Sequence, residues 1–241
     1  PAILPTLSAQ AARGALDELR TTIGFGLRMI FFIILPAMLG LILLRHPIVH
    51  LVFEHGSFTK ADTLATATAL LCYAVGLWAF AGVRIIVSAF YSLQDTRTPA
   101  VTAGIAVGAN ILLSLWLMTL LDAAGLALAT ALASMLNGSI LVAVLHRRLG
   151  RVDWGSIVWS AFRVLGACIP VAVMCLWVAN ASLWDQDGAW VVKSAALFGG
   201  IGVSVIGYLG VHIMLGSEEL DVVLGMVKRK LGRVAKKFGA A

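Results

Sequence analysis

Long apolar segments separated by short polar stretches form the main pattern along the 241-residue chain. A helix that crosses a bilayer needs about 20 mostly apolar residues, because the hydrocarbon core is about 30 Å thick and each residue rises about 1.5 Å. The segments of this kind are Ile23–Leu44, Thr63–Phe90, Ala100–Leu121, Ala123–Leu145, Val158–Ala179 and Trp190–Leu215. Strands of a membrane barrel would have about 10 residues of alternating polarity. The pattern therefore predicts an all-α membrane protein with six transmembrane helices.

Two local features refine these helices. Only Asp122 and the small residues around it separate the third segment from the fourth, so the two are expected to form an antiparallel hairpin. Pro36 and Pro170 lie inside segments, where each removes a backbone hydrogen bond and is expected to kink its helix.

Composition agrees with a membrane location. Hydrophobic residues make up 60% of the chain and charged residues 12%, whereas a soluble domain has about 25% charged residues. This excess of apolar residues argues against a soluble globular enzyme and against a disordered chain. Cys72, Cys168 and Cys175 all fall within apolar segments, so they are interpreted as small buried hydrophobes rather than a disulfide framework.

The basic residues predict how the helices are oriented. Of the 18 Lys and Arg residues, 12 fall on one side of the membrane: Arg13, Arg20, Arg97, Arg147, Arg148, Arg151, Lys228, Arg229, Lys230, Arg233, Lys236 and Lys237. Because basic loops stay in the cytoplasm, both ends of this segment are predicted to be cytoplasmic. Residues 217–241 are expected to form a basic tail on anionic lipid. Nucleic acid is not an expected partner, since only Phe238 could stack among those charges.

Three arginines lie within the predicted spans, which contain no Asp or Glu: Arg28, Arg84 and Arg163. Ionisable residues in a membrane are costly and are functional candidates by default. A guanidinium matches the geometry of phosphate acceptors, so these residues are candidates for binding a phosphate-bearing substrate. The alternative is that their side chains reach the headgroups from one or two helical turns inside the membrane.

Neutral polar residues form a second group of candidates, on the two arms of the expected hairpin. Asn110 and Ser114 share one face of the third span, and Thr130 lies on the fourth. Hydrogen bonds between the helices explain such residues in most membrane proteins. The alternative is a small-ion site built from side-chain and carbonyl oxygens.

The loop after the first span suggests a metal site only weakly. His46, His50 and Glu54 recur at four-residue spacing, but Pro47 and the flanking hydrophobes fit a short helix at the membrane interface better. The chain has no nucleophile–base pair and no phosphate-cradling glycine loop. We therefore expect no enzymatic activity, no metal and no cofactor.

A set of motifs resembles a known family. These motifs are Leu4-Pro5-x-Leu7-Ser8, Gly26-Leu27-Arg28, Phe53-x-x-Gly56-x-Phe58-Thr59, Tyr73-x-x-Gly76-Leu77 and Phe90-Tyr91-Ser92-x-Gln94-Asp95-Thr96-x-Thr98-Pro99. The chain resembles the C-terminal half of the lipid II flippases of the MurJ/MviN type, within the multidrug/oligosaccharidyl-lipid/polysaccharide exporter superfamily. The resemblance extends over essentially the whole chain.

The resemblance implies a fold and a function. Such flippases have fourteen spans, of which the six here would be the ninth to the fourteenth. Residues 1–22 would hold the end of the preceding helix and a cytoplasmic loop, 23–150 four helices of the C-terminal lobe, and 151–216 two additional helices lining a groove for the lipid tail. Together with an N-terminal lobe of the same protein, they would move undecaprenyl-diphosphate-linked peptidoglycan precursor, lipid II, across the bacterial inner membrane by alternating access.

The resemblance also bears on the candidate residues. Arg28, Arg84 and Arg163 match basic positions of the family pattern, whereas the best-known cavity arginines of the family fall outside this chain. Some relatives bind sodium near the hairpin, and Asn110 and Thr130 fit that pattern, although Ser114 stands where an acidic ligand is expected. The alternative functions are an O-antigen or polysaccharide-lipid flippase, a multidrug exporter of the same superfamily, or a membrane scaffold without transport.

Overall fold

The computed structural model describes residues 3–150, 152–185, 190–217, 219–223 and 225. Within these residues the chain forms helices and no strands. The α-helices are α1 (Ile3–Ala12), α2 (Leu16–Leu43), α3 (Arg45–Phe53), α4 (Lys60–Val75), α5 (Leu77–Ser92), α6 (Arg97–Leu149), α7 (Trp154–Ala167), α8 (Ile169–Ala179) and α9 (Trp190–Met214). A short 3₁₀ helix, η1 (Ser182–Asp185), precedes α9. The predicted all-α fold is confirmed.

Helices long and apolar enough to cross a membrane account for most of the described residues. By length and composition there are four, namely α2, the stretch Lys60–Ser92 that joins α4 and α5, α6, and α9. A fifth is counted if the bent pair α7 and α8 is one span. The 53 residues of α6 contain two of the predicted segments. Each of the six predicted segments thus corresponds to a helix, an arm of α6 or a pair of consecutive helices.

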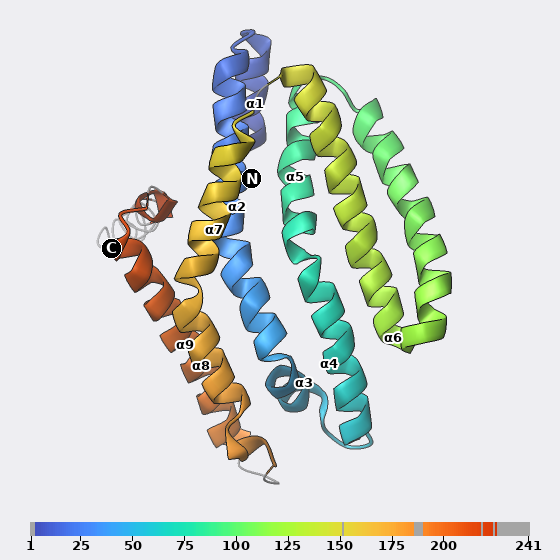
Figure 1. Ribbon diagram of the computed structural model, residues 1–241, viewed down its shortest axis with the longest axis vertical. Coiled ribbons are helices and arrows are strands. Elements are labelled where there is room, and N and C mark those ends of the chain that lie inside the picture. Colours follow the sequence, from blue (N-terminus) through green and yellow to red (C-terminus); the bar gives the residue numbers. More distant parts are fainter. Residues whose placement is uncertain (1–2, 151, 186–189, 218, 224, 226–241) are drawn as a thin grey trace, which may run out of the picture.

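Helix α6 turns back on itself at Asp122, whose φ of 49° and ψ of −130° are not helical. The two arms, 97–121 and 123–149, lie side by side in Figure 1. Asn110 on the first arm donates a hydrogen bond to the Thr130 hydroxyl on the second, with Nδ2 3.2 Å from Oγ1. The predicted antiparallel hairpin is confirmed.

The two prolines inside spans have different effects. Pro170 lies in the first turn of α8, just after a 42° bend between α7 and α8. An N–H in the first turn has no hydrogen-bond partner within the helix, so proline loses no bond there. Pro36 lies inside α2, which continues as one helix from Leu16 to Leu43. The bend near Pro170 follows the prediction, whereas the kink expected at Pro36 stays a prediction.

Helix α2 lies in the middle of the bundle, with α4, α5 and α6 on one side and α7, α8 and α9 on the other (Figure 1). Two clusters of buried apolar side chains meet at this helix. Phe32 and Val164 belong to the cluster that joins α2 with α7, α8 and α9. Leu19, Phe90 and Leu145 belong to the cluster that joins α2 with α1, α5 and the end of α6. Packing against α2 therefore fixes how the two sides face each other.

Large apolar side chains also cover the outside of the bundle. Leu112 on α6 is 71% exposed, and Val191 on α9 is 77% exposed. A soluble monomer rarely exposes contiguous apolar surface on this scale. Lipid is the solvent that such a surface fits, so the exposed side chains agree with the predicted membrane location.

One boundary differs from the prediction, and one expected feature is present. Helix α2 begins at Leu16 rather than at Ile23, because Asp17, Glu18 and Arg20 extend the helix beyond its apolar segment as a polar first turn. The loop after α2 contains the expected short helix, α3, at the end of the bundle opposite α1 (Figure 1). Most of the basic segment predicted for residues 217–241 lies outside the described residues.

Candidate lipid groove and the residues around it

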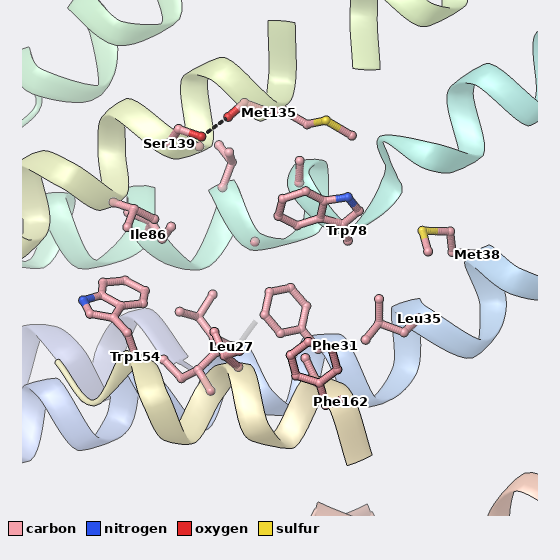
Figure 2. A pocket seen from close by; sticks show the side chains of 18 of the residues that line it. Leu27, Phe31, Leu35, Met38, Trp78, Ile86, Met135, Ser139, Trp154 and Phe162 are labelled. Atoms are coloured by element: carbon pink, nitrogen blue, oxygen red, sulfur yellow. Dashed lines mark hydrogen bonds between the residues drawn. The ribbon is translucent and has the colours of Figure 1, made fainter. Parts of the chain in front are cut away.

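An apolar groove lies between the two sides of the bundle (Figure 2). Its volume of about 820 Å³ falls in the range of about 300–1,000 Å³ that is usual for ligand pockets. The walls come from α2, α5, the second arm of α6, and α7. Side chains that line it include Leu27, Phe31, Leu35, Met38, Trp78, Ile86, Met135, Ser139, Trp154 and Phe162.

Helical periodicity and small residues together create this groove. On α2 the lining residues recur at every third or fourth position, as Leu27, Phe31, Leu35 and Met38. This spacing keeps them on one face of the helix. On the opposite wall, Gly82, Gly138 and Ala143 carry little or no side chain. The groove therefore lies between the bulky face of α2 and a wall on which small residues alternate with large ones such as Trp78 and Met135.

Few polar atoms enter the groove, and those of three lining residues are already bonded within the chain. Ser139 donates to the carbonyl oxygen of Met135 at 2.8 Å. Trp154 donates from Nε1 to Nδ1 of His146 at 3.2 Å. A hydrocarbon chain can thus occupy the groove without leaving these groups unpaired, whereas a polar ligand would find little to bind.

The groove agrees only in part with the expected lipid-tail groove of residues 151–216. Helix α7 contributes one wall, through residues such as Ile157 and Ala161. No residue of α8 or α9 lines the groove in the part of the chain that the structure describes. The walls from α2, α5 and α6 were not predicted, because hydropathy shows which residues are apolar but not which helix faces meet.

Arg28 contacts a carboxylate that the sequence analysis did not assign to it. Its Nη1 donates to Oγ of Ser156 at 3.2 Å, and its Nε lies 4.0 Å from Oε1 of Glu219. Ser160 donates to the same Glu219 oxygen at 3.1 Å. Glu219 is 8% exposed, although it follows the last span. The shared cytoplasmic side predicted for Arg28 and Glu219 was the signal in the sequence that could have paired them.

Arg84 and Arg163 remain exposed on α5 and α7. Neither guanidinium has a hydrogen-bond or ion-pair partner among the described residues. Each follows a groove-lining residue in the chain, Val83 for Arg84 and Phe162 for Arg163. The structure therefore places both arginines on helices of the groove wall but not among its lining residues.

Two of the three neutral polar candidates are brought together. The hydrogen bond between Asn110 and Thr130 joins the arms of α6, and the Thr130 hydroxyl also donates to the carbonyl oxygen of Leu126 at 2.9 Å. Ser114 makes no side-chain hydrogen bond within the described ranges. An ion site at Asn110, Ser114 and Thr130 therefore stays a prediction, while the interhelical hydrogen bond is present.

The histidines of α3 do not form a metal-type cluster. Nowhere in the part of the chain that the structure describes do three or more His, Cys, Asp or Glu side chains gather as metal ligands would. Instead, His50 contacts Glu54, with Nδ1 2.8 Å from Oε2. His46 lines a small pocket together with His50 and Glu54 but does not join this contact.

The Asp95-Thr96-x-Thr98-Pro99 motif ties the start of α6 to its end. Asp95 accepts hydrogen bonds from the Thr98 backbone N–H at 2.9 Å and from the Thr98 hydroxyl at 2.6 Å. Its second oxygen also pairs with Nη1 of Arg148 at 2.7 Å. The bonds from Thr98, with a smaller contribution from Arg148, hold the pKa of the Asp95 carboxyl below its ordinary value.

This lowered pKa predicts an acid-dependent stability. A carboxylate whose pKa is lower in the folded state stabilises the fold above its unfolded pKa, and the stabilisation is lost as pH falls through the folded pKa, below about pH 4. In thermal unfolding, Asp95→Asn is expected to lower the midpoint at neutral pH by about 2–4 °C. On acidification, the midpoint of thermal unfolding should fall further in the wild-type protein than in the variant. Equal losses in both proteins would contradict this role.

Comparison with known proteins finds relatives that match most of the chain. The family model described as lipid II flippase MurJ matches residues 1–198. A probable lipid II flippase MurJ of Vibrio cholerae is 33% identical over 227 residues, covering 91% of this chain and 42% of the relative. A protein of the same name from Rhizobium meliloti is 31% identical over 232 residues, covering 94% of this chain and 43% of the relative. The chain thus spans less than half the length of these relatives.

A solved structure has the same fold. The inward closed conformation of a lipid II flippase MurJ superposes with a TM-score of 0.65 at 23% identity, covering 90% of this chain and 44% of that one. The arrangement of helices around α2 is therefore an arrangement that occurs in a known membrane protein.

Proposed function

The chain belongs to the lipid II flippase MurJ family, and we propose that it takes part in moving lipid II, the undecaprenyl-diphosphate-linked precursor of peptidoglycan, across the bacterial inner membrane. Its apolar helices and its relatives make it part of a multi-pass membrane protein. In this proposal 23–150 form the C-terminal lobe and 151–216 add two helices. Alternating access is then a rocking of this lobe against an N-terminal lobe of the same transporter.

The apolar groove is the observation that carries this proposal. A polyprenyl chain is a long hydrocarbon, and burying it against Leu27, Phe31 and Phe162 removes apolar surface from polar surroundings at about 25 cal/mol per Å². Among the described residues, none that lines the groove is an Asp or Glu, which argues against an organic cation as the bound molecule. The groove thus supports a lipid-linked substrate over the cationic drugs that some exporters carry.

The arginines would act on the diphosphate. Arg84 and Arg163 are exposed beside groove-lining residues and have no partner in the described part of the chain. A guanidinium with five donors can contact phosphate oxygens in pairs. Arg28, which contacts Ser156 and Glu219, is the least available of the three. Its proposed contact with substrate requires that Glu219 move away.

Charge supports the proposed orientation. Twelve of the 18 basic residues fall on the side that holds both ends of the chain in the predicted topology. The positive-inside rule then places these ends in the cytoplasm. The end of the bundle that holds α3 would face the opposite side of the membrane.

Filling the groove tests the function. In the complete transporter that contains this chain, Ala143→Trp is expected to reduce lipid II transport by at least about tenfold, because the indole occupies the space of the lipid tail and a loss of about 1.4 kcal/mol in binding is tenfold. The measurement is growth after depletion of the native flippase, with lipid II accumulation as a second readout.

Ala103→Trp is the matched control, since Ala103 is exposed on the first arm of the same helix and does not line the groove. It should support growth like the unmutated transporter. Normal growth with Ala143→Trp at normal protein abundance would contradict the lipid-groove proposal. Failure of the unmutated transporter to support growth would contradict lipid II transport itself.

A further inference from the structure

Pro36 leaves one backbone carbonyl group inside α2 without its usual partner. In an α-helix each carbonyl accepts a hydrogen bond from the N–H four residues later, and proline has no N–H to donate. Since Pro36 lies inside α2, the carbonyl that loses its donor is that of Phe32. Phe32 is buried in the cluster that joins α2 with α7, α8 and α9. A buried carbonyl without a donor costs free energy comparable to a lost hydrogen bond.

Tyr208 on α9 supplies the missing donor. Its hydroxyl donates to the carbonyl oxygen of Phe32 at 2.7 Å. Tyr208 is itself buried, so this bond forms inside the protein. In membrane helices a neighbouring helix can satisfy a backbone group that proline has freed. Here the neighbour is α9, and the phenol hydroxyl takes the place of the absent N–H.

Aromatic packing holds the Tyr208 ring in position. The ring centroid of Tyr208 lies 5.3 Å from that of Phe32 and 4.6 Å from that of His212. The rings of Phe32 and His212 are also in contact, with centroids 4.7 Å apart. Nδ1 of His212 in turn lies 2.9 Å from the hydroxyl oxygen of Ser217, just after α9. The three rings thus form one cluster between α2 and α9 that aims the hydroxyl at α2.

Close packing against α8 sets the position of Tyr208 along α2. Helix α9 packs along α8, and α8 packs against α2. Gly207, the residue before Tyr208, faces Pro170 so closely that a Cβ there would lie 3.1 Å from the Cβ of Pro170. At Gly200 a Cβ would lie 2.5 Å from Cγ2 of Val178. These two approaches fix α9 on α8, and the tyrosine side chain reaches past α8 to the Phe32 carbonyl.

Pro36 lies within the part of α2 that forms a wall of the groove. Leu35 precedes the proline and Met38 follows it, and both line the groove (Figure 2). A change in the direction of α2 at Pro36 would therefore move Met38 relative to Leu27 and Phe31 on the same wall. No described residue of α9 lines the groove, so any effect of Tyr208 on the groove acts through α2.

We propose that Tyr208 is a positioning residue for the groove. Its hydroxyl replaces the N–H that Pro36 lacks and holds α2 as one helix from Leu16 to Leu43. Without the hydroxyl, the Phe32 carbonyl has no donor and α2 gains freedom to bend at Pro36. The effect on α2 is independent of what the groove binds, whereas its consequence for a lipid substrate rests on the proposed function.

Hydrogen–deuterium exchange of the complete transporter in detergent micelles tests the bond. In Tyr208→Phe, exchange of the amides of residues 37–40, the turn after Pro36, is expected to rise about tenfold over wild type, as for the loss of one buried hydrogen bond. Pro36→Ala gives the Phe32 carbonyl its own N–H donor. The double variant Pro36→Ala/Tyr208→Phe should therefore exchange at the wild-type rate. Because it carries the same phenylalanine, this recovery separates the bond from the packing of the ring.

Ser204→Ala is the matched control. Ser204 is a buried hydroxyl one turn earlier on α9, and its hydrogen-bond partners among the described residues, Gly200 and Cys175, lie on α9 and α8. Its loss should leave the exchange of residues 37–40 unchanged. The proposal is overturned if Tyr208→Phe exchanges at the wild-type rate, if the double variant stays fast, or if Ser204→Ala gives the same rise.

Binding of undecaprenyl diphosphate to the same variants tests the consequence for the groove. Tyr208→Phe is expected to weaken the affinity by about three- to tenfold, because the freedom that α2 gains must be lost again on binding. The double variant should bind like wild type. Unchanged affinity in Tyr208→Phe would overturn the positioning role. Failure of the wild-type transporter to bind this probe would contradict the proposed function, while the exchange experiment would still decide whether Tyr208 holds α2.

Discussion

Arg84→Ala, in the complete transporter that contains this chain, is expected to reduce lipid II transport by about 10–100-fold and to prevent growth when the native flippase is depleted. Arg84 is exposed on α5 next to Val83 of the groove wall, and no described residue pairs with its guanidinium. A hydrogen bond to a charged group contributes about 1.5–3 kcal/mol, which corresponds to this loss. Growth on depletion and lipid II accumulation measure the effect.

Two variants separate charge from geometry. Arg84→Lys keeps the charge but loses the planar fork, so it should retain part of the transport. Arg97→Ala removes an exposed arginine at the start of α6, on the arm that contributes no described residue to the groove lining, and should transport normally. Full growth with Arg84→Ala would remove Arg84 from the mechanism and leave it as a residue that only reaches the headgroups.

Gly125→Ala is expected to destabilise the α6 hairpin by roughly 3 kcal/mol or more, at the upper end of overpacking effects. A Cβ at this position would overlap the carbonyl group of Leu117 and lie 2.8 Å from the backbone nitrogen of Met118. Backbone atoms cannot move aside as a flexible side chain can, so the arms must separate near Asp122. Thermal unfolding in detergent and the abundance of membrane-inserted protein measure the loss.

Gly104→Ala on the same helix provides the matched control. A Cβ there would meet no atom of the chain within 4 Å. Because alanine is favoured over glycine within a helix by about 0.5–1 kcal/mol, this variant should be unchanged or slightly more stable. An unfolding midpoint of Gly125→Ala equal to that of Gly104→Ala would show that the close approach of the two arms is not required.

Local sequence features predicted the elements of this fold well. The apolar segments were long enough to identify each spanning helix, and Asp122 with its small neighbours identified the hairpin. The bend between α7 and α8 was expected from Pro170. These features succeed because a helix that crosses lipid must make all its backbone hydrogen bonds within itself. Length and hydropathy within one segment are therefore sufficient to identify it.

The candidate site was less predictable, as Arg28 shows. The sequence placed Arg28, Arg84 and Arg163 together as charges within spans, and nothing in their spacing distinguished them. The structure pairs Arg28 with Glu219, whereas Arg84 and Arg163 have no such partner among the described residues. Which charge is compensated depends on a residue beyond the last span that folds back against α2 and α7.

By itself, the sequence determined that this chain is an all-α membrane protein, and its motifs identified the family. Only the tertiary structure decided that α2, α5, α6 and α7 enclose the groove and that the Tyr208 hydroxyl donates to the Phe32 carbonyl. The physical reason is that hydropathy and helix breakers act within one segment. A groove or a buried hydrogen bond between helices depends instead on which faces of distant helices pack together, and in lipid, where all apolar faces are alike, close packing rather than hydrophobicity makes that choice.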